Sequence, residues 1–179
     1  MRRNWRRPKR LLFWARPVCW ISSRWQVHLI LHIINPSIIF LFCDLYNWAG
    51  QIRTINISKK GTVFVPAAEI PSCADACFSR LAAFTDEGLS HQKFIEAIAD
   101  FYNTINMLHP FREGNGRTQR LFFTQWIRHL GYEFDLSDVD PDEFMIATIY
   151  AAQGVMDPLI EFFEQKLQGP TMGLDMTFR

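Results

Sequence analysis

The stretch His109-Pro110-Phe111-Arg112-Glu113-Gly114-Asn115-Gly116-Arg117-Thr118-Gln119-Arg120 gathers one imidazole, one carboxylate, two glycines around an asparagine, and three guanidinium groups. Apolar residues at helical spacing precede it and follow it. The preceding set is Phe94, Ile95, Ile98, Phe101, Tyr102, Ile105 and Leu108, and the following set is Leu121, Phe122, Trp126, Ile127 and Leu130. The spacing therefore predicts two core helices joined by a tight polar loop.

The composition of this loop suits a phosphate. A Gly-Asn-Gly segment (114–116) that opens a helix directs backbone N–H groups at one point, where the helix dipole adds partial positive charge. Arg117 and Arg120 share one helix face and can hold phosphate oxygens. Glu113 is a candidate Mg²⁺ ligand, and His109 can take a proton from a hydroxyl. Together these residues predict transfer chemistry on a nucleoside polyphosphate.

Each of these residues also has an ordinary structural interpretation. A histidine at a helix end often bonds to backbone, and a glutamate near a helix start often complements the dipole. The combination is harder to explain in this way, because glycines in a first helical turn and stacked arginines cost stability unless an anion is bound. We therefore favour a nucleotide site.

The motif His109-x-Phe111-x-Glu113-Gly114-Asn115-Gly116-Arg117-x-x-Arg120 resembles the complete signature loop of the Fic family. The resemblance implies an all-α fold, with a Fic-type helical core and a short β-hairpin flap over the active site. It also implies a protein adenylyltransferase, which transfers AMP from ATP-Mg²⁺ to a Tyr, Thr or Ser hydroxyl of a target protein.

The resemblance implies a role for each motif residue. His109 would be the general base and Glu113 the magnesium ligand. Asn115, with the amides of Gly114 and Gly116, would form the phosphate cradle. Glycine at position 116 favours adenylylation, since relatives resembling the Doc toxin have lysine there and transfer phosphate.

The other three motif residues would support the nucleotide. Arg117 and Arg120 would hold the β- and γ-phosphates, and Phe111 would pack inward to fix the loop. The same scaffold could instead transfer UMP, phosphocholine or phosphate, or could be a catalytically impaired module that binds a nucleotide or peptide.

A hairpin is expected before the helical core. Residues 52–57 alternate apolar and polar side chains, residues 58–61 form a turn signal, and residues 62–65 are β-branched and aromatic. In the resembled family the corresponding flap pairs with the backbone of the target as an added strand. The candidate residues that position the target are Thr62, Val63 and Phe64.

Helix signals follow along the rest of the chain. The first expected helix runs from about residue 71 to 84, and the second from Ser90 as N-cap to Leu108. The helix after the polar loop ends at Leu130-Gly131. Two more helices begin at Asp140-Pro141 and at Asp157-Pro158, and the last ends at about Leu167. Residues 169–179 are expected to be a flexible tail.

The chain changes character at about Asp44. Residues 1–43 contain no acidic side chain and eight of the 19 Lys and Arg residues, whereas residues 44–179 carry 11 basic against 18 acidic side chains. We expect a Fic domain at 44–168 and an atypical basic and apolar segment at 1–43. A shifted reading frame at the start of the gene is the favoured explanation for that segment.

Other interpretations of the N-terminal segment are weaker. The apolar run 27–43 is shorter than the ~20 residues of a spanning helix and contains Asn35-Pro36, so no membrane segment is expected. The arginines and tryptophans lack a nucleic-acid motif, so no nucleic-acid partner is expected. Cysteines without CxxC spacing suit a reducing cytoplasm.

A regulatory partner is implied by the resemblance. Many Fic proteins carry a Ser/Thr-x-x-x-Glu-Gly/Asn helix whose glutamate pairs with the second motif arginine, here Arg120. The nearest pattern, Glu87-Gly88, has Ala83 where Ser or Thr is required. We therefore expect a toxin whose inhibitory glutamate is supplied in trans by a small antitoxin.

Overall fold

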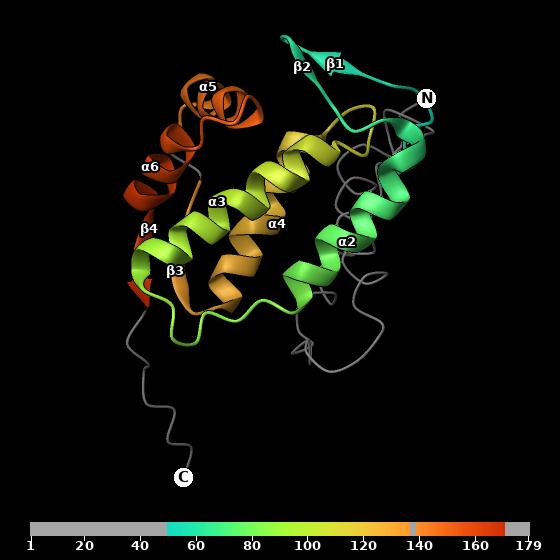
Figure 1. Cartoon of the computed structure of the whole chain (residues 1–179). Helices are drawn as coiled ribbons and strands as arrows, with labels where there is room; N and C mark the ends of the chain where they lie inside the picture. Colours follow the sequence, from blue (N-terminus) through green and yellow to red (C-terminus); the bar gives the residue numbers. More distant parts are fainter. Residues whose placement is uncertain (1–49, 137–138, 171–179) are drawn as a thin grey trace, which may run out of the picture.

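The computed structural model describes residues 50–136 and 139–170 of the chain (Figure 1). Five α-helices form its body: α2 (Ile70–Ala82), α3 (His91–Leu108), α4 (Asn115–His129), α5 (Pro141–Ala152) and α6 (Asp157–Lys166). A 3₁₀ turn, η1 (Ala67–Glu69), precedes α2. Two small antiparallel pairs complete it: β1 (Ser58–Lys59) with β2 (Thr62–Val63), and β3 (Tyr132–Phe134) with β4 (Leu167–Pro170). The expected all-α core with a short hairpin is confirmed.

Helix α3 lies at the centre of this arrangement and contacts α2, α4, α5 and α6 (Figure 1). Its helical apolar stripe is the face predicted from the sequence, and every member is at most 5% exposed: Phe94, Ile95, Ile98, Phe101, Tyr102, Ile105 and Leu108. The Ser90 side chain caps its start by accepting from the Lys93 N–H at 3.3 Å. A long helix with a continuous buried face gives the residue after its last turn a rigid support.

The starts of the two C-terminal helices differ from each other. Asp140 caps α5, because its carboxylate accepts from the Asp142 N–H at 2.8 Å and Pro141 occupies the first turn. The expected start of α6 at Asp157-Pro158 is confirmed, with Pro158 in the first turn. Asp157 lies inside that turn, with Met156 as the N-cap residue and no side-chain cap bond, so Asp157 complements the helix dipole.

The first strand of the hairpin lies later in the sequence than expected. This strand is Ser58–Lys59, inside the segment predicted to be a turn, and the turn is reduced to Lys60 and Gly61, both with positive φ. Two positive φ values in a two-residue turn match the right-handed twist of the flanking strands. The alternation over 52–57 does not form a strand.

The β3–β4 pair was not predicted from the sequence. Phe134 pairs with Leu167 and Glu133 with Gln168, across more than thirty residues of chain. Strand β4 takes in Gly169 and Pro170, which the sequence assigned to the tail. Such short strands carry no periodic signal, because only the partner strand stabilises them.

The N-terminal segment 1–43 and the first residues of the expected Fic domain lie outside the described residues, and the proposed frame shift stays a prediction. No helix that the structure describes has the length and apolar character needed to cross a membrane.

Candidate active site

The loop between α3 and α4 reverses the chain through two left-handed residues. His109 ends α3 with φ 39° and ψ 59°, and its N–H still bonds the Ile105 carbonyl at 3.3 Å. Gly114 precedes α4 with φ 84°, a conformation that favours glycine. One tight turn therefore connects the histidine to the start of α4.

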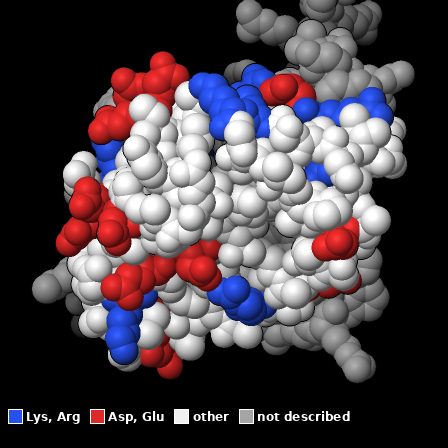
Figure 2. Space-filling view, turned by 45° about the horizontal axis from the view of Figure 1, so that its top comes forward, with Lys and Arg blue, Asp and Glu red and all other residues white. Residues whose placement is uncertain are grey.

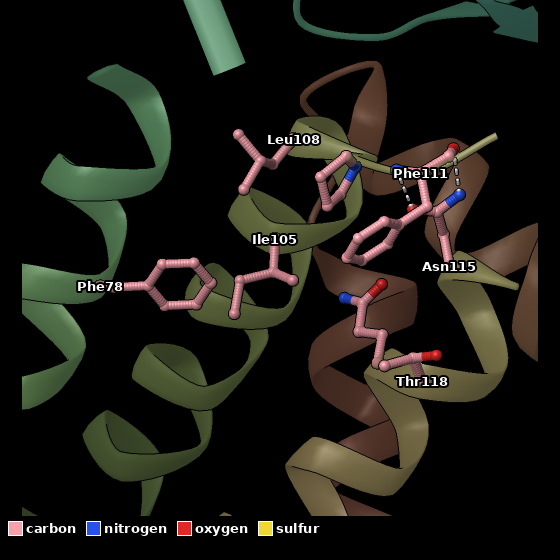
Figure 3. Close-up of a pocket in the computed structure, with 8 residues that line it drawn as sticks. Phe78, Ile105, Leu108, Phe111, Asn115 and Thr118 are labelled. Atoms are coloured by element: carbon pink, nitrogen blue, oxygen red, sulfur yellow. Dashed lines mark hydrogen bonds between the residues drawn. The ribbon is translucent and has the colours of Figure 1, made fainter. Parts of the chain in front are cut away.

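The Asn115 side chain closes this turn. Its Oδ1 accepts from the Phe111 N–H at 2.9 Å, and its Nδ2 donates to the Phe111 carbonyl at 2.7 Å (Figure 3). Both residues are buried. The Asn115 amide therefore uses one of its two N–H donors and one acceptor lone pair on the loop itself, and the residue also has its backbone N–H at the first turn of α4 to offer to a phosphate.

Phe111 points away from the loop surface into a small pocket behind it. Phe78 of α2 and Ile105 and Leu108 of α3 line this pocket, as Figure 3 shows. The Thr118 hydroxyl also lies there, and it is buried without a hydrogen-bond partner. A mainly apolar pocket does not suit a triphosphate, so Phe111 supports the loop from behind.

The His109 ring is held in a defined tautomer. Its Nδ1 lies 3.2 Å from the Asn106 carbonyl, which can only accept, so Nδ1 carries the proton and Nε2 carries the free lone pair. The Phe64 ring stacks on it, with 3.8 Å between the centroids. Burial lowers the pKa of His109 from 6.5 to about 4, against the opposing effect of the bond to Asn106. The imidazole is therefore neutral at pH 7 and can accept a proton at Nε2.

The charged residues of the motif lie on the exposed side of the loop. Glu113 Oε1 accepts from the Gly114 N–H at 3.1 Å and lies 3.8 Å from an Arg117 guanidinium nitrogen. One guanidinium nitrogen of Arg120 lies 3.4 Å from the point that a Cβ on Gly116 would occupy. One carboxylate and two guanidinium groups thus surround the first turn of α4. Among the described residues no group of three or more His, Cys, Asp and Glu side chains forms a metal site.

The hairpin lies beside this loop and reaches toward α5 (Figure 1). At its base the Val65 N–H donates to the Met107 carbonyl of α3 at 3.0 Å, and at its tip the Lys60 ammonium lies 3.2 Å from the Met145 sulfur of α5. Figure 2 brings this end of the molecule forward and shows a central area without charged side chains, flanked by acidic and basic groups.

The three flap candidates have different surroundings. Phe64 is buried on His109, Thr62 is half-buried opposite Lys59, and Val63 is 73% exposed. The structure therefore brings only Phe64 into contact with the histidine. Thr62 and Val63 form β2, whose backbone edge away from β1 carries no partner strand among the described residues.

Arg53 is a residue of this site that sequence reasoning missed. It is a polar position of the alternating stretch 52–57, yet Arg53 is 2% exposed while Ile52 and Ile55 are 36% and 52% exposed. Its guanidinium donates to the His109 carbonyl at 2.8 Å. Nothing in the local pattern reveals this burial, because the acceptors come from segments distant in the sequence.

The chain is similar to known proteins over most of the described region. The model of the Fic/DOC family matches residues 28–127. The protein named "Probable protein adenylyltransferase y4lH" from Sinorhizobium fredii is 40% identical over 120 residues, which are 66% of this chain. This chain spans 62% of the length of that relative.

Two solved structures have the same fold. The N-terminal Fic domain of a VirB-translocated Bep effector protein from Bartonella quintana, with bound ADP, has a TM-score of 0.72 and 26% identity, over 84% of this chain and 76% of that one. The BepC protein from Bartonella tribocorum, with bound AMPPNP, has a TM-score of 0.69 and 28% identity, over 79% of this chain and 74% of that one.

Proposed function

Because this chain belongs to the Fic/DOC family, we propose that it is a protein adenylyltransferase that transfers AMP from ATP to a hydroxyl group of a target protein. The observation that carries the proposal is the turn itself. It connects a neutral imidazole, with its lone pair on Nε2, to the helix start that carries Arg117 and Arg120. A base and an anion site on one rigid turn are what transfer from a polyphosphate requires.

The reaction uses the residues of the loop in a fixed order. The N–H groups at the start of α4 and the guanidinium groups of Arg117 and Arg120 bind the phosphates of ATP. Nε2 of His109 removes the proton from a Tyr, Thr or Ser hydroxyl of the target. The oxygen then attacks the α-phosphorus, the bond to the bridging oxygen breaks, and pyrophosphate leaves. The base contributes about 10²–10⁴-fold to the rate.

Glu113 fits the expected magnesium ion. Mg²⁺ in nucleotide sites is held by one or two carboxylates together with substrate phosphates, and Glu113 supplies one exposed carboxylate beside the helix start. The ion would neutralise charge on the phosphates when bound. Before that, Glu113 is engaged by the Gly114 N–H and Arg117, so metal and nucleotide compete with these contacts.

The target binds along the flap in this proposal. Val63 exposes its side chain, and the outer edge of β2 offers backbone groups to an added strand of the target. A strand in that position passes close to His109, because the next residue, Phe64, stacks on the imidazole. Main-chain pairing would therefore set which hydroxyl reaches Nε2.

We also propose that a small antitoxin controls the enzyme in the cytoplasm. Its glutamate would pair with Arg120 beside Gly116 and block the γ-phosphate. Co-purification of a small partner that is lost in Arg120→Ala would support this regulation. Unchanged growth of cells that express the chain alone at high level would contradict it.

Labelled nucleotides test the activity. Label from α-labelled ATP, and not from γ-labelled ATP, should enter a protein band of a cell lysate, and His109→Ala should abolish that label while retaining ATP binding. Entry of the γ-label would indicate phosphate transfer, and competition by UTP would indicate transfer of UMP. Wild-type labelling by His109→Ala would remove the histidine from the mechanism.

A further inference from the structure

The Arg53 residue holds three successive carbonyl groups at the end of α3. Its Nε donates to the His109 carbonyl at 2.8 Å, and a terminal nitrogen lies 3.4 Å from the Leu108 carbonyl. Its backbone N–H donates to the Pro110 carbonyl at 2.8 Å. The last carbonyls of a helix have no partner within the helix and lie at the negative end of its dipole, so a guanidinium suits them.

The same side chain also holds both arms of the flap. One terminal nitrogen donates to the Ile55 carbonyl at 2.8 Å, before β1, and the other donates to the Val65 carbonyl, after β2. Val65 follows Phe64, the residue stacked on His109. The planar fork of one arginine therefore joins the two flap arms to the turn that carries the histidine.

The Arg53 guanidinium is buried between the flap arms and the end of α3. The side chain is 2% exposed, its hydrogen bonds run to backbone carbonyls, and burial lowers the pKa of its guanidinium. A buried charge costs stability unless it is fully hydrogen-bonded, so the guanidinium stays buried only while the carbonyls of the flap arms and of the α3 end surround it together. Its planar fork makes four hydrogen bonds, to the Ile55 and Val65 carbonyls of the flap arms and to the Leu108 and His109 carbonyls at the end of α3.

We propose that Arg53 is a positioning residue that couples the flap to His109, so that the strand presenting the target hydroxyl and the imidazole that receives its proton keep one relative position. This inference rests on the proposed adenylyl transfer. The backbone of His109 supports it, since a left-handed conformation is unfavourable for a residue with a Cβ and needs external bonds to persist.

The decisive variant is Arg53→Lys, which keeps the charge and loses the planar fork. Arg128→Lys is the matched control, because Arg128 also donates to a backbone carbonyl, that of Phe134 at 2.9 Å, in the β3 region. The probe is AMP transfer from α-labelled ATP-Mg²⁺ onto a lysate protein band. We expect Arg53→Lys to slow transfer about 10–100-fold through kcat, with ATP affinity close to that of the control, when both variants are assayed well below their melting temperatures. Transfer within twofold of the control would overturn the proposal.

Amide hydrogen exchange tests the coupling without catalysis. In the wild type the N–H groups of Arg53, Val65 and His109 should share one protection factor, because they open together, and in Arg53→Lys all three should exchange faster. Protection of Val65 more than about tenfold below that of His109 would overturn the coupling. If the wild type transfers no AMP from ATP, the proposed function fails, and the exchange measurement still decides the role of Arg53.

Discussion

The Phe64 ring lies face to face with the His109 imidazole, with 3.8 Å between ring centroids and 18° between ring planes. One ring belongs to the flap and the other to the proposed catalytic turn, 45 residues later in the chain. The contact covers one face of the imidazole and so contributes to the burial that lowers the pKa of His109. Four predictions concern this arrangement and the loop around it.

Removal of the stacked ring should change the pH dependence of transfer. In Phe64→Ala water reaches the imidazole, so the pKa of His109 should rise from about 4 toward 6.5. The base works only when neutral, and the acid limb of kcat/KM should therefore move to higher pH. Initial rates between pH 4.5 and 8 measure this shift. Val63→Ala, on the exposed neighbour in the flap, should leave the limb in place.

Stability should depend on pH through the same histidine. The pKa of His109 is about 4 in the folded protein and about 6.5 in the unfolded chain, so the unfolded state binds more protons between these values. The free energy of unfolding should be highest above pH 6.5. It should fall as pH drops toward 4, by at most about 3 kcal/mol. Urea denaturation at several pH values gives the slope of unfolding free energy against pH for the wild type and for His109→Gln. Equal slopes would show that His109 is not shielded.

The Asn115 amide should matter for the loop more than for direct phosphate contact. Asn115→Asp keeps an acceptor for the Phe111 N–H and places a carboxylate oxygen against the Phe111 carbonyl. Unfolding free energy should fall by about 1–3 kcal/mol, and ATP affinity should fall with it. Asn56→Ala is the control, because exposed Asn56 also accepts from a backbone N–H, that of Ala67, outside the loop. Calorimetry with ATP and thermal melting provide both values.

The two glycines of the motif should respond oppositely to alanine. Gly114 has φ 84°, so Gly114→Ala should cost about 1–2 kcal/mol of stability. Gly116 is helical without positive φ, and Gly116→Ala should raise stability by about 0.5–1 kcal/mol. Its methyl group would nevertheless lie on Arg120 at the start of α4, and ATP binding should weaken. Unaltered ATP affinity in Gly116→Ala would show that phosphate does not approach this turn.

Much of this organisation could be predicted from the residues alone. The buried stripe of α3, the Ser90 cap and the turn at 109–114 follow from local spacing, because helix periodicity and capping involve residues within one or two turns. The motif also indicated which residues belong to the site, since histidine, glutamate, asparagine and arginines in that order resemble the signature of one family.

The tertiary structure decided what each of these side chains touches. It turned the Asn115 amide onto Phe111, placed Phe64 on His109 and buried Arg53 against carbonyls from both flap arms and the end of α3. It also formed the β3–β4 pair and moved the flap strand to Ser58–Lys59. The physical reason is common to these cases. Periodicity records only neighbours along the chain, whereas hydrogen bonds and ring contacts between distant segments exist only once packing has brought those segments together.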